Sequence, residues 1–411
     1  MFSLKTIRDI NLKNKKILFR VALDIPLADG QVKEDYRIRQ IIPTLNYLLR
    51  NNCSVVILTW LGRPEGKVVS KYKLNPVAKR LAQLIKQPVK KMDDCVGLRV
   101  KQVINNLKPK QVVMLENVRF HPEEQSNNPR FAKELTQGLD LIVFDAFAQA
   151  HRVHASTVGI LDYLPAVAGL LLEKEITQLS RIFDRPVRPA VLIIGGAKIS
   201  DKVALITNLA PRVDKVLIGG AVAHVFLKAQ GIEMAQSFLE DVYVDQAKGQ
   251  KKDLVRVAKE LIKKYRTKII LPLDLVAARS DNSQKVETIN LAQARIKSGW
   301  LYNDIGSQTI KSFGQEIAKA KIIIWNGPMG LFEKSQFVLG TRGVALAIAK
   351  SSAVSILGGG DTEKIVKMFR LDGRFSHIST GGGAMLNFLG GEKLPALLNL
   401  AKNQRNKQFF H

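Results

Sequence analysis

Short runs of apolar residues, many of them β-branched, alternate along the chain with stretches whose apolar residues recur at helical spacing. The runs predict strands at residues 16–21, 54–59, 112–115, 141–144, 190–194, 215–218, 268–271, 322–325 and 355–357. Helical spacing is clearest at 74–84 and 253–265. Strands that are apolar almost throughout are covered on both faces, so the alternation predicts an α/β protein with parallel sheets flanked by helices.

The length of 411 residues predicts two domains, because one ordinary core does not grow that large. A helical segment at 171–182 is followed by residues 184–189, which contain two prolines and three charged residues. Such a composition is typical of a domain junction. We therefore place the division near residue 180.

Four glycine-rich segments follow predicted strands in the second half of the chain. They are Gly195-Gly196, Gly327-Pro328-Met329-Gly330, Gly358-Gly359-Gly360 and Gly381-Gly382-Gly383. Glycine allows close approach of the backbone to a ligand, and a helix start directs N–H groups at an anion. Ligands bind beyond the carboxyl ends of parallel strands, so these loops predict a nucleotide site. The spacing is not that of a Walker A loop.

Charged side chains accompany the glycine loops, and arginines mark the first half. Lys198, Lys202 and Asp361 lie in or beside the loops, and a carboxylate such as Asp361 suits Mg²⁺ together with phosphate oxygens. In the first half, arginine occurs at four loop positions: Arg37, Arg63, Arg119 and Arg152. The planar guanidinium group matches carboxylate and phosphate, so these residues predict an anionic site facing the nucleotide site.

The charge of the chain is strongly positive, because 63 Lys and Arg outnumber 36 Asp and Glu, giving +27. An anionic partner, either nucleic acid or a phosphorylated metabolite, is one interpretation. The other is a basic bias spread over solvated faces, which we favour because the lysines are scattered and no nucleic-acid-binding signature appears. Two cysteines, no signal region and no apolar run of membrane-spanning length predict a cytoplasmic protein without a membrane partner.

From near one end to the other, the chain resembles the phosphoglycerate kinase family. The resemblance rests on Arg20-Val21, residues 61–64, 116–120, 150–152 and 154–157, and the four glycine loops in this order. It implies two Rossmann-like domains joined by a hinge: residues 1–180 for the glycerate and 181–389 for the nucleotide, with the tail 390–411 packing back on the first. The implied activity is reversible phosphoryl transfer between 1,3-bisphosphoglycerate and ADP, giving 3-phosphoglycerate and MgATP, by a monomer.

The resemblance also implies roles for individual residues. Arg37 and Lys202 would act in catalysis. Substrate binding would fall to Arg37, Arg63, Arg119, Arg152 and His151. The nucleotide would be bound by Gly195, Lys198, Lys202, Asn326, Glu333, Gly359, Gly360, Asp361 and Thr362, with Asp361 at the Mg²⁺ ion.

Several positions depart from the family pattern. Ala22, Asp24 and Trp60 stand where the family has aspartate, asparagine and histidine, and these positions help to recognise the glycerate. Ala221 and Tyr302 replace glycines of the nucleotide site. A hydrogen bond to a charged group is worth roughly 1.5–3 kcal/mol. Three hypotheses therefore stay open: an active kinase with an altered glycerate site, a weakened or silent relative that acts as a binding protein, and a nucleic-acid-binding role.

Overall fold

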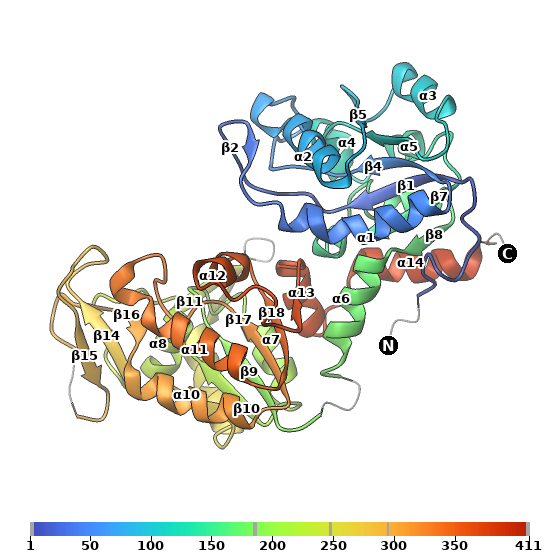
Figure 1. Ribbon diagram of the computed structural model, residues 1–411. Helices are drawn as coiled ribbons and strands as arrows, with labels where there is room; N and C mark the ends of the chain where they lie inside the picture. Colours follow the sequence, from blue (N-terminus) through green and yellow to red (C-terminus); the bar gives the residue numbers. More distant parts are fainter. Residues whose placement is uncertain (1–3, 184–186, 246–248, 294–295, 408–411) are drawn as a thin grey trace. The chain divides into compact units, whose positions relative to one another are not determined.

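The computed structural model describes residues 4–183, 187–245, 249–293 and 296–407 (Figure 1). Internal contacts gather the chain into two compact units. The first unit runs to Thr177 and includes the residues from Lys393 onward, and the second unit is Gln178–Glu392. Of the junction expected at 184–189, residues 184–186 lie outside the described part. The assignment of one ligand to each unit, and the hinge, stay predictions.

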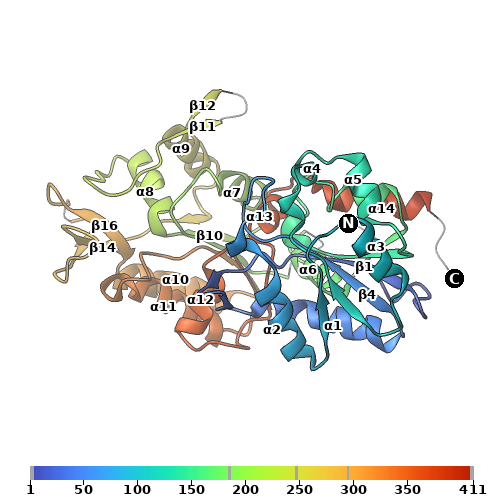
Figure 2. The ribbon, with the colours of Figure 1, turned by 90° about the horizontal axis from the view of Figure 1, so that it is seen from above.

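The first unit is built on a six-stranded parallel sheet in the order β5-β6-β4-β1-β7-β8. These strands are β1 (Lys16–Val21), β4 (Ser54–Leu58), β5 (Val89–Lys91), β6 (Val112–Met114), β7 (Leu141–Asp145) and β8 (Ala166–Ala168). Helices α1 (Tyr36–Arg50) and α2 (Asn75–Ile85) cover one face of the sheet, and α4 (Pro122–Gln125) and α5 (Pro129–Leu135) cover the other (Figures 1 and 2). Strands β1, β4 and β7 are almost wholly buried, as their apolar sequences require.

The end of the chain returns to this unit as α14 (Pro395–Asn406), which packs beside β8. The side chain of Asn403 is buried there and accepts a hydrogen bond from the N–H of Ala166 (2.9 Å) while donating to the carbonyl of Leu164 (2.8 Å). A buried amide with its partners satisfied fixes the register of the helix against the strand.

The second unit contains another six-stranded parallel sheet, in the order β13-β10-β9-β17-β18-β19. Its strands are β9 (Ala190–Ile194), β10 (Lys215–Ile218), β13 (Ile269–Ile270), β17 (Ile322–Asn326), β18 (Val354–Gly358) and β19 (His377–Ile378). Helices α7 (Val203–Leu209), α8 (Gly220–Ala229) and α9 (Leu254–Lys264) lie on one face, and α10 (Ser307–Lys319), α11 (Leu339–Lys350) and α12 (Thr362–Met368) on the other (Figure 2). The strand order reverses between β9 and β17, the point at which such sheets bind ligands.

The predicted fold class is confirmed, and each predicted strand is present with bounds that differ by at most two residues at either end. The sequence pattern did not predict the antiparallel sheet of β14 (Asp274–Ala278), β15 (Glu287–Asn290) and β16 (Leu301–Ile305). Strands β15 and β16 mix polar and apolar residues, so they carry no continuous apolar signal. In the described part of the chain, no helix is long and apolar enough to cross a membrane.

Candidate functional site

The predicted site residues of the first unit lie at one edge of its sheet. Residues 22–24 follow β1, residues 60–63 follow β4, Arg119 lies in a short 3₁₀ helix after β6, and residues 146–152 follow β7. All these strands are parallel, so their carboxyl ends meet at the same edge. Arg37 lies in the first turn of α1, and Arg63 and Arg152 are exposed.

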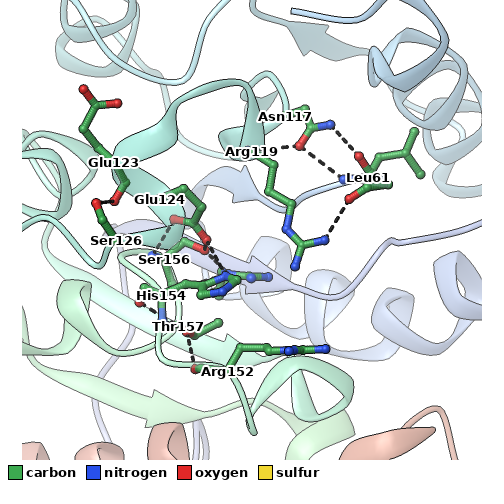
Figure 3. Close-up of polar contacts among 12 residues, drawn as sticks. Leu61, Asn117, Arg119, Glu123, Glu124, Ser126, Arg152, His154, Ser156 and Thr157 are labelled. Atoms are coloured by element: carbon green, nitrogen blue, oxygen red, sulfur yellow. Dashed lines mark hydrogen bonds and ion pairs between the residues drawn. The ribbon is translucent and has the colours of Figure 1, made fainter. Parts of the chain in front are cut away.

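Arg119 is held by the loop after β4. Its Nη1 donates to the carbonyl of Gly62 (2.7 Å), and Asn117 fixes the same loop by donating to the carbonyl of Leu61 (2.7 Å) and accepting from its N–H (3.2 Å) (Figure 3). The guanidinium carbon lies 4.1 Å from the centre of the Trp60 ring, within cation–π distance. Arg119 is therefore fixed on two sides by neighbours in the first unit.

A buried ion network lies below this arginine. Arg20 is fully buried, and its Nε donates to the carbonyl of Ser156 (2.9 Å). The Ser156 hydroxyl donates to the buried carboxylate of Glu124 (2.6 Å) (Figure 3). Burial lowers the pKa of Arg20 to about 9, against the opposing effect of Glu124. Burial also raises the pKa of Glu124, which Arg20 opposes in turn. The Glu124 carboxylate thus supplies a counter-charge to Arg20 and Arg119.

Polar atoms without a protein partner concentrate at this edge. Among the buried side-chain atoms of the described residues, those lacking a hydrogen bond include Arg20 Nη2, Arg119 Nε, both amide atoms of Gln149, and Nδ1 of His151 and of His154. Burial, followed by the nearby arginines, lowers the pKa of His151 and of His154 to about 4, so both are neutral near pH 7. Unpaired buried donors require a partner, and a carboxylate or phosphate ligand would supply it.

The departures in the first unit are integrated into its loops. Asp24 Oδ1 accepts a hydrogen bond from the N–H of Gly62 (2.9 Å), and the Asp24 carbonyl accepts from Arg37 Nη1 (2.8 Å). Burial lowers the pKa of Arg119, and the charge of Asp24 opposes this shift. The Asp24 carboxylate therefore connects two of the loops that carry the predicted site.

In the second unit, the glycines let neighbouring loops interlock. The N–H of Gly195 donates to the carbonyl of Asn326 (2.8 Å), and that of Gly196 to the carbonyl of Pro328 (2.7 Å). A Cβ on Gly195 would lie 2.1 Å from the Pro328 oxygen, so no larger residue fits. The sequence argument, in which these N–H groups are bare and face phosphate, is therefore wrong for these two residues. Contact of Gly195 with a nucleotide stays a prediction.

A pocket of about 570 Å³ opens beside these loops. Its walls come from the segments that follow β9, β10, β17 and β18 and from strands β14 and β16. They include four predicted or departing positions: Ala221, Tyr302, Glu333 and Asp361. Tyr302 is buried and belongs to the wall of this pocket, and its backbone N–H donates to the Ser237 hydroxyl (2.8 Å). Six other residues predicted to bind the nucleotide are not among the residues that line this pocket: Gly195, Lys198, Lys202, Asn326, Gly359 and Gly360. The side chain of Thr362 lies outside the described part.

Lys202 and Asp361 are close enough to influence each other. Burial lowers the pKa of Lys202, while Asp201 and Asp361 oppose this shift. Asp361 also lies 3.5 Å from Lys364 Nζ, and Lys198 is exposed. Magnesium is commonly bound by one or two carboxylates plus substrate phosphates, and the partly exposed Asp361 carboxylate on the pocket wall fits that requirement.

Sequence reasoning missed several residues of both sites. Gln149 was not identified in the first unit, and Gln236, Asp281 and Asn303 were not identified on the pocket wall of the second. Asn303 donates to Asp281 (3.1 Å) between two segments that are 22 residues apart. Only the antiparallel sheet brings these segments together, and no sequence signal predicted that sheet.

A family model described as "Phosphoglycerate kinase" matches residues 7–392. A phosphoglycerate kinase of Pelotomaculum thermopropionicum is 43% identical over 397 residues, covering 96% of this chain and 98% of the relative. One from Dictyoglomus turgidum is 44% identical over 392 residues, covering 95% and 96%. The solved structure of phosphoglycerate kinase from Coxiella burnetii has a TM-score of 0.83 at 36% identity and covers 98% of this chain and 100% of its own.

The chain has two α/β units, each built on a parallel sheet; the first bears buried unpaired donors, and the second bears interlocked glycine loops beside a pocket. The family model and the relatives identify the class of this protein as a kinase, a phosphotransferase. The family match covers most of the chain, and the relatives are similar over nearly their whole length. The chain belongs to the phosphoglycerate kinase family.

Proposed function

We propose that this chain transfers a phosphoryl group reversibly between 1,3-bisphosphoglycerate and ADP, giving 3-phosphoglycerate and ATP. The observation that carries the proposal is the set of unpaired buried donors at the sheet edge of the first unit, on Arg20, Arg119 and their neighbours. A phosphorylated carboxylate supplies several acceptor oxygens to such donors. The family membership established above supports the same reaction.

In the first unit, the proposed work of the residues is electrostatic. Arg63, Arg119, Arg152 and His151 would bind the glycerate, and Arg37 would offset charge on the transferring group. Phosphoryl transfer needs little covalent chemistry from the protein, so positioning and charge stabilisation dominate. This accounts for a cluster in which the two histidines are held neutral instead of poised as bases near pH 7.

In the second unit, the pocket would hold the nucleotide, with Glu333 toward the ribose and Asp361 toward the phosphates. Lys202 would offset phosphate charge, with Lys198, Asn326, Gly359, Gly360 and Thr362 nearby. Asp361 and phosphate oxygens would hold Mg²⁺, which supplies charge neutralisation when bound. We further propose a cytoplasmic monomer that needs neither nucleic acid nor membrane. Its two cysteines are free and buried, as suits a reducing compartment.

A coupled assay with ATP, Mg²⁺ and 3-phosphoglycerate tests the proposal. We expect turnover within about a hundredfold of the median enzyme rate of roughly 10 per second. The substitutions at Ala22, Asp24 and Trp60 favour a second candidate, a silent relative that binds nucleotide. Absence of product, together with ADP binding in calorimetry, would select that candidate.

A further inference from the structure

The ring of Trp60 contacts two arginines of the first unit, Arg20 and Arg119. The Trp60 side chain is 2% exposed, and its ring centre lies 4.1 Å from the guanidinium carbon of Arg119 and 4.6 Å from that of Arg20. The His154 ring is 5.2 Å away, inclined by 48°. An indole offers the most favourable aromatic face for a cation, and Arg is its most frequent partner. Two such contacts on one buried ring are more than packing alone requires.

The neighbours of Trp60 explain what these contacts do. Arg20 and Arg119 carry like charges that are near enough to interact, because Arg119 helps to lower the pKa of Arg20. Arg20 is fixed by Ser156, whereas Nη1 of Arg119 bonds to the Gly62 carbonyl and its Nε is buried without a partner. One hydrogen bond leaves a guanidinium free to rotate about it. Stacking on a ring fixes the plane of the group.

We propose that Trp60 is a positioning residue for the phosphorylated substrate. The Trp60 ring stacks against Arg119 and fixes the plane of its guanidinium, whose Nε is buried without a partner. This inference rests on the proposed function for the identity of the ligand. It also assigns the altered position a role: the ring replaces the family's histidine by orienting an arginine. The glycerate site would then use Trp60 in place of the histidine. Asp24 supports the same arrangement, because its carboxylate accepts a hydrogen bond from Gly62 in the loop that carries Trp60.

The test compares three variants with the unmodified protein in the coupled assay. Trp60→Leu removes the aromatic face, and we expect the KM for 3-phosphoglycerate to rise about tenfold. The KM for ATP should change less than about twofold, because the pocket lies in the other unit. Trp60→Phe keeps an aromatic face and should restore most of the affinity. Trp60→His should raise the KM, because imidazole stacks less favourably on two arginines.

A control variant separates this role from general loss of an aromatic residue. Tyr265 in the second unit is also mostly buried (9% exposed), and its ring centre lies 5.4 Å from Lys264 Nζ. Tyr265→Leu should leave the KM for 3-phosphoglycerate unchanged. A purely structural role for Trp60 predicts a lower melting temperature and no rescue by phenylalanine. That result would overturn the proposal. So would an unchanged KM for 3-phosphoglycerate in Trp60→Leu, or a lower KM in Trp60→His.

Binding measurements keep this inference separate from the proposed activity. If the unmodified protein shows no turnover, calorimetric titration with 3-phosphoglycerate still ranks the variants. If Trp60→Leu does not fold, the fluorescence change on adding 3-phosphoglycerate is compared between the unmodified protein and Trp60→Phe. We expect the fluorescence of the unmodified protein to change, because the ligand would contact Arg119, which stacks on the Trp60 indole. The change should disappear in Trp60→Phe, because this variant lacks that indole. An identical change in both proteins overturns the inference.

Discussion

The two units build their candidate sites from different materials. The first unit uses side chains, with arginines balanced by Glu124 and Asp24 and oriented by Trp60. The second uses backbone, with loops that interlock through glycines that have no space for a Cβ. When one side chain is substituted, its neighbours can form hydrogen bonds with other partners. Loops whose backbones are in direct contact at glycines leave no space for a larger residue. This explains why the first unit accommodates three altered residues (Ala22, Asp24 and Trp60) within its candidate site. The two altered residues of the second unit, Ala221 and Tyr302, instead lie on the wall of the pocket.

The largest expected effect tests the charged first unit. Arg37→Ala removes a guanidinium whose Nη1 donates to the Asp24 carbonyl (2.8 Å). If Arg37 offsets charge in the transition state, kcat in the coupled assay should fall about a thousandfold. Arg37→Lys, which keeps the charge without the planar fork, should recover only part of the loss. A decrease of less than tenfold in Arg37→Ala would remove Arg37 from the catalytic role.

The next effect contrasts two lysines of the second unit. Lys202 is half-buried and close enough to Asp361 for the two charges to interact, whereas Lys198 is exposed. Lys202→Ala should weaken ADP binding about tenfold to a hundredfold, because a charge-assisted contact in a desolvated place is strong. Lys198→Ala should change it less than about threefold. Calorimetry with MgADP measures both. Equal losses in the two variants would contradict the proposed burial-dependent difference.

A third prediction tests the steric argument in the backbone-built site. A Cβ on Gly195 would lie 2.1 Å from the Pro328 oxygen, whereas a Cβ on Gly360 has no neighbour within 4 Å. Overpacking of this kind costs about 1–3 kcal/mol. Gly195→Ala should therefore lower the melting temperature by roughly 2–10 °C and weaken ADP binding. Gly360→Ala, the matched control, should alter the melting temperature by less than about 2 °C. Similar melting curves for both variants would refute the steric explanation.

The same contrast explains what sequence could and could not predict. Continuous apolar runs such as 190–194 identified the parallel strands, because burial on both faces leaves a pattern in the sequence itself. Arg119 and the glycine loops were found because they follow such strands. The bond from Asn303 to Asp281 and the orphaned amide of Gln149 depend on three-dimensional contacts that no local pattern encodes. Likewise, the sequence shows Trp60 as a departure, but its two arginine partners come from distant segments, Arg20 from β1 and Arg119 from the 3₁₀ helix after β6.

The smallest expected effect concerns the pH dependence of stability in the first unit. The pKa of His151 and of His154 falls to about 4 on folding, from an ordinary value near 6.5. The unfolded chain therefore binds protons that the folded chain does not between about pH 6.5 and 4. Stability consequently decreases as the pH falls through this window and levels off below it.

Replacing both residues, as in His151→Asn with His154→Asn, should make stability less dependent on pH between about 4 and 6.5. Buried carboxyl groups act in the opposite direction, because the pKa of Asp145 and of Asp304 rises to about 7 and their contribution falls as the pH rises from 3.8 to 7. Both groups remain in the double variant, so the difference between the two proteins isolates the histidines. Urea denaturation at pH 7.0, 6.0, 5.0 and 4.5 (chosen to span roughly this window) measures that difference. Parallel profiles would show that the histidines take up protons equally in both states, and that a ligand-free arginine cluster does not hold them neutral.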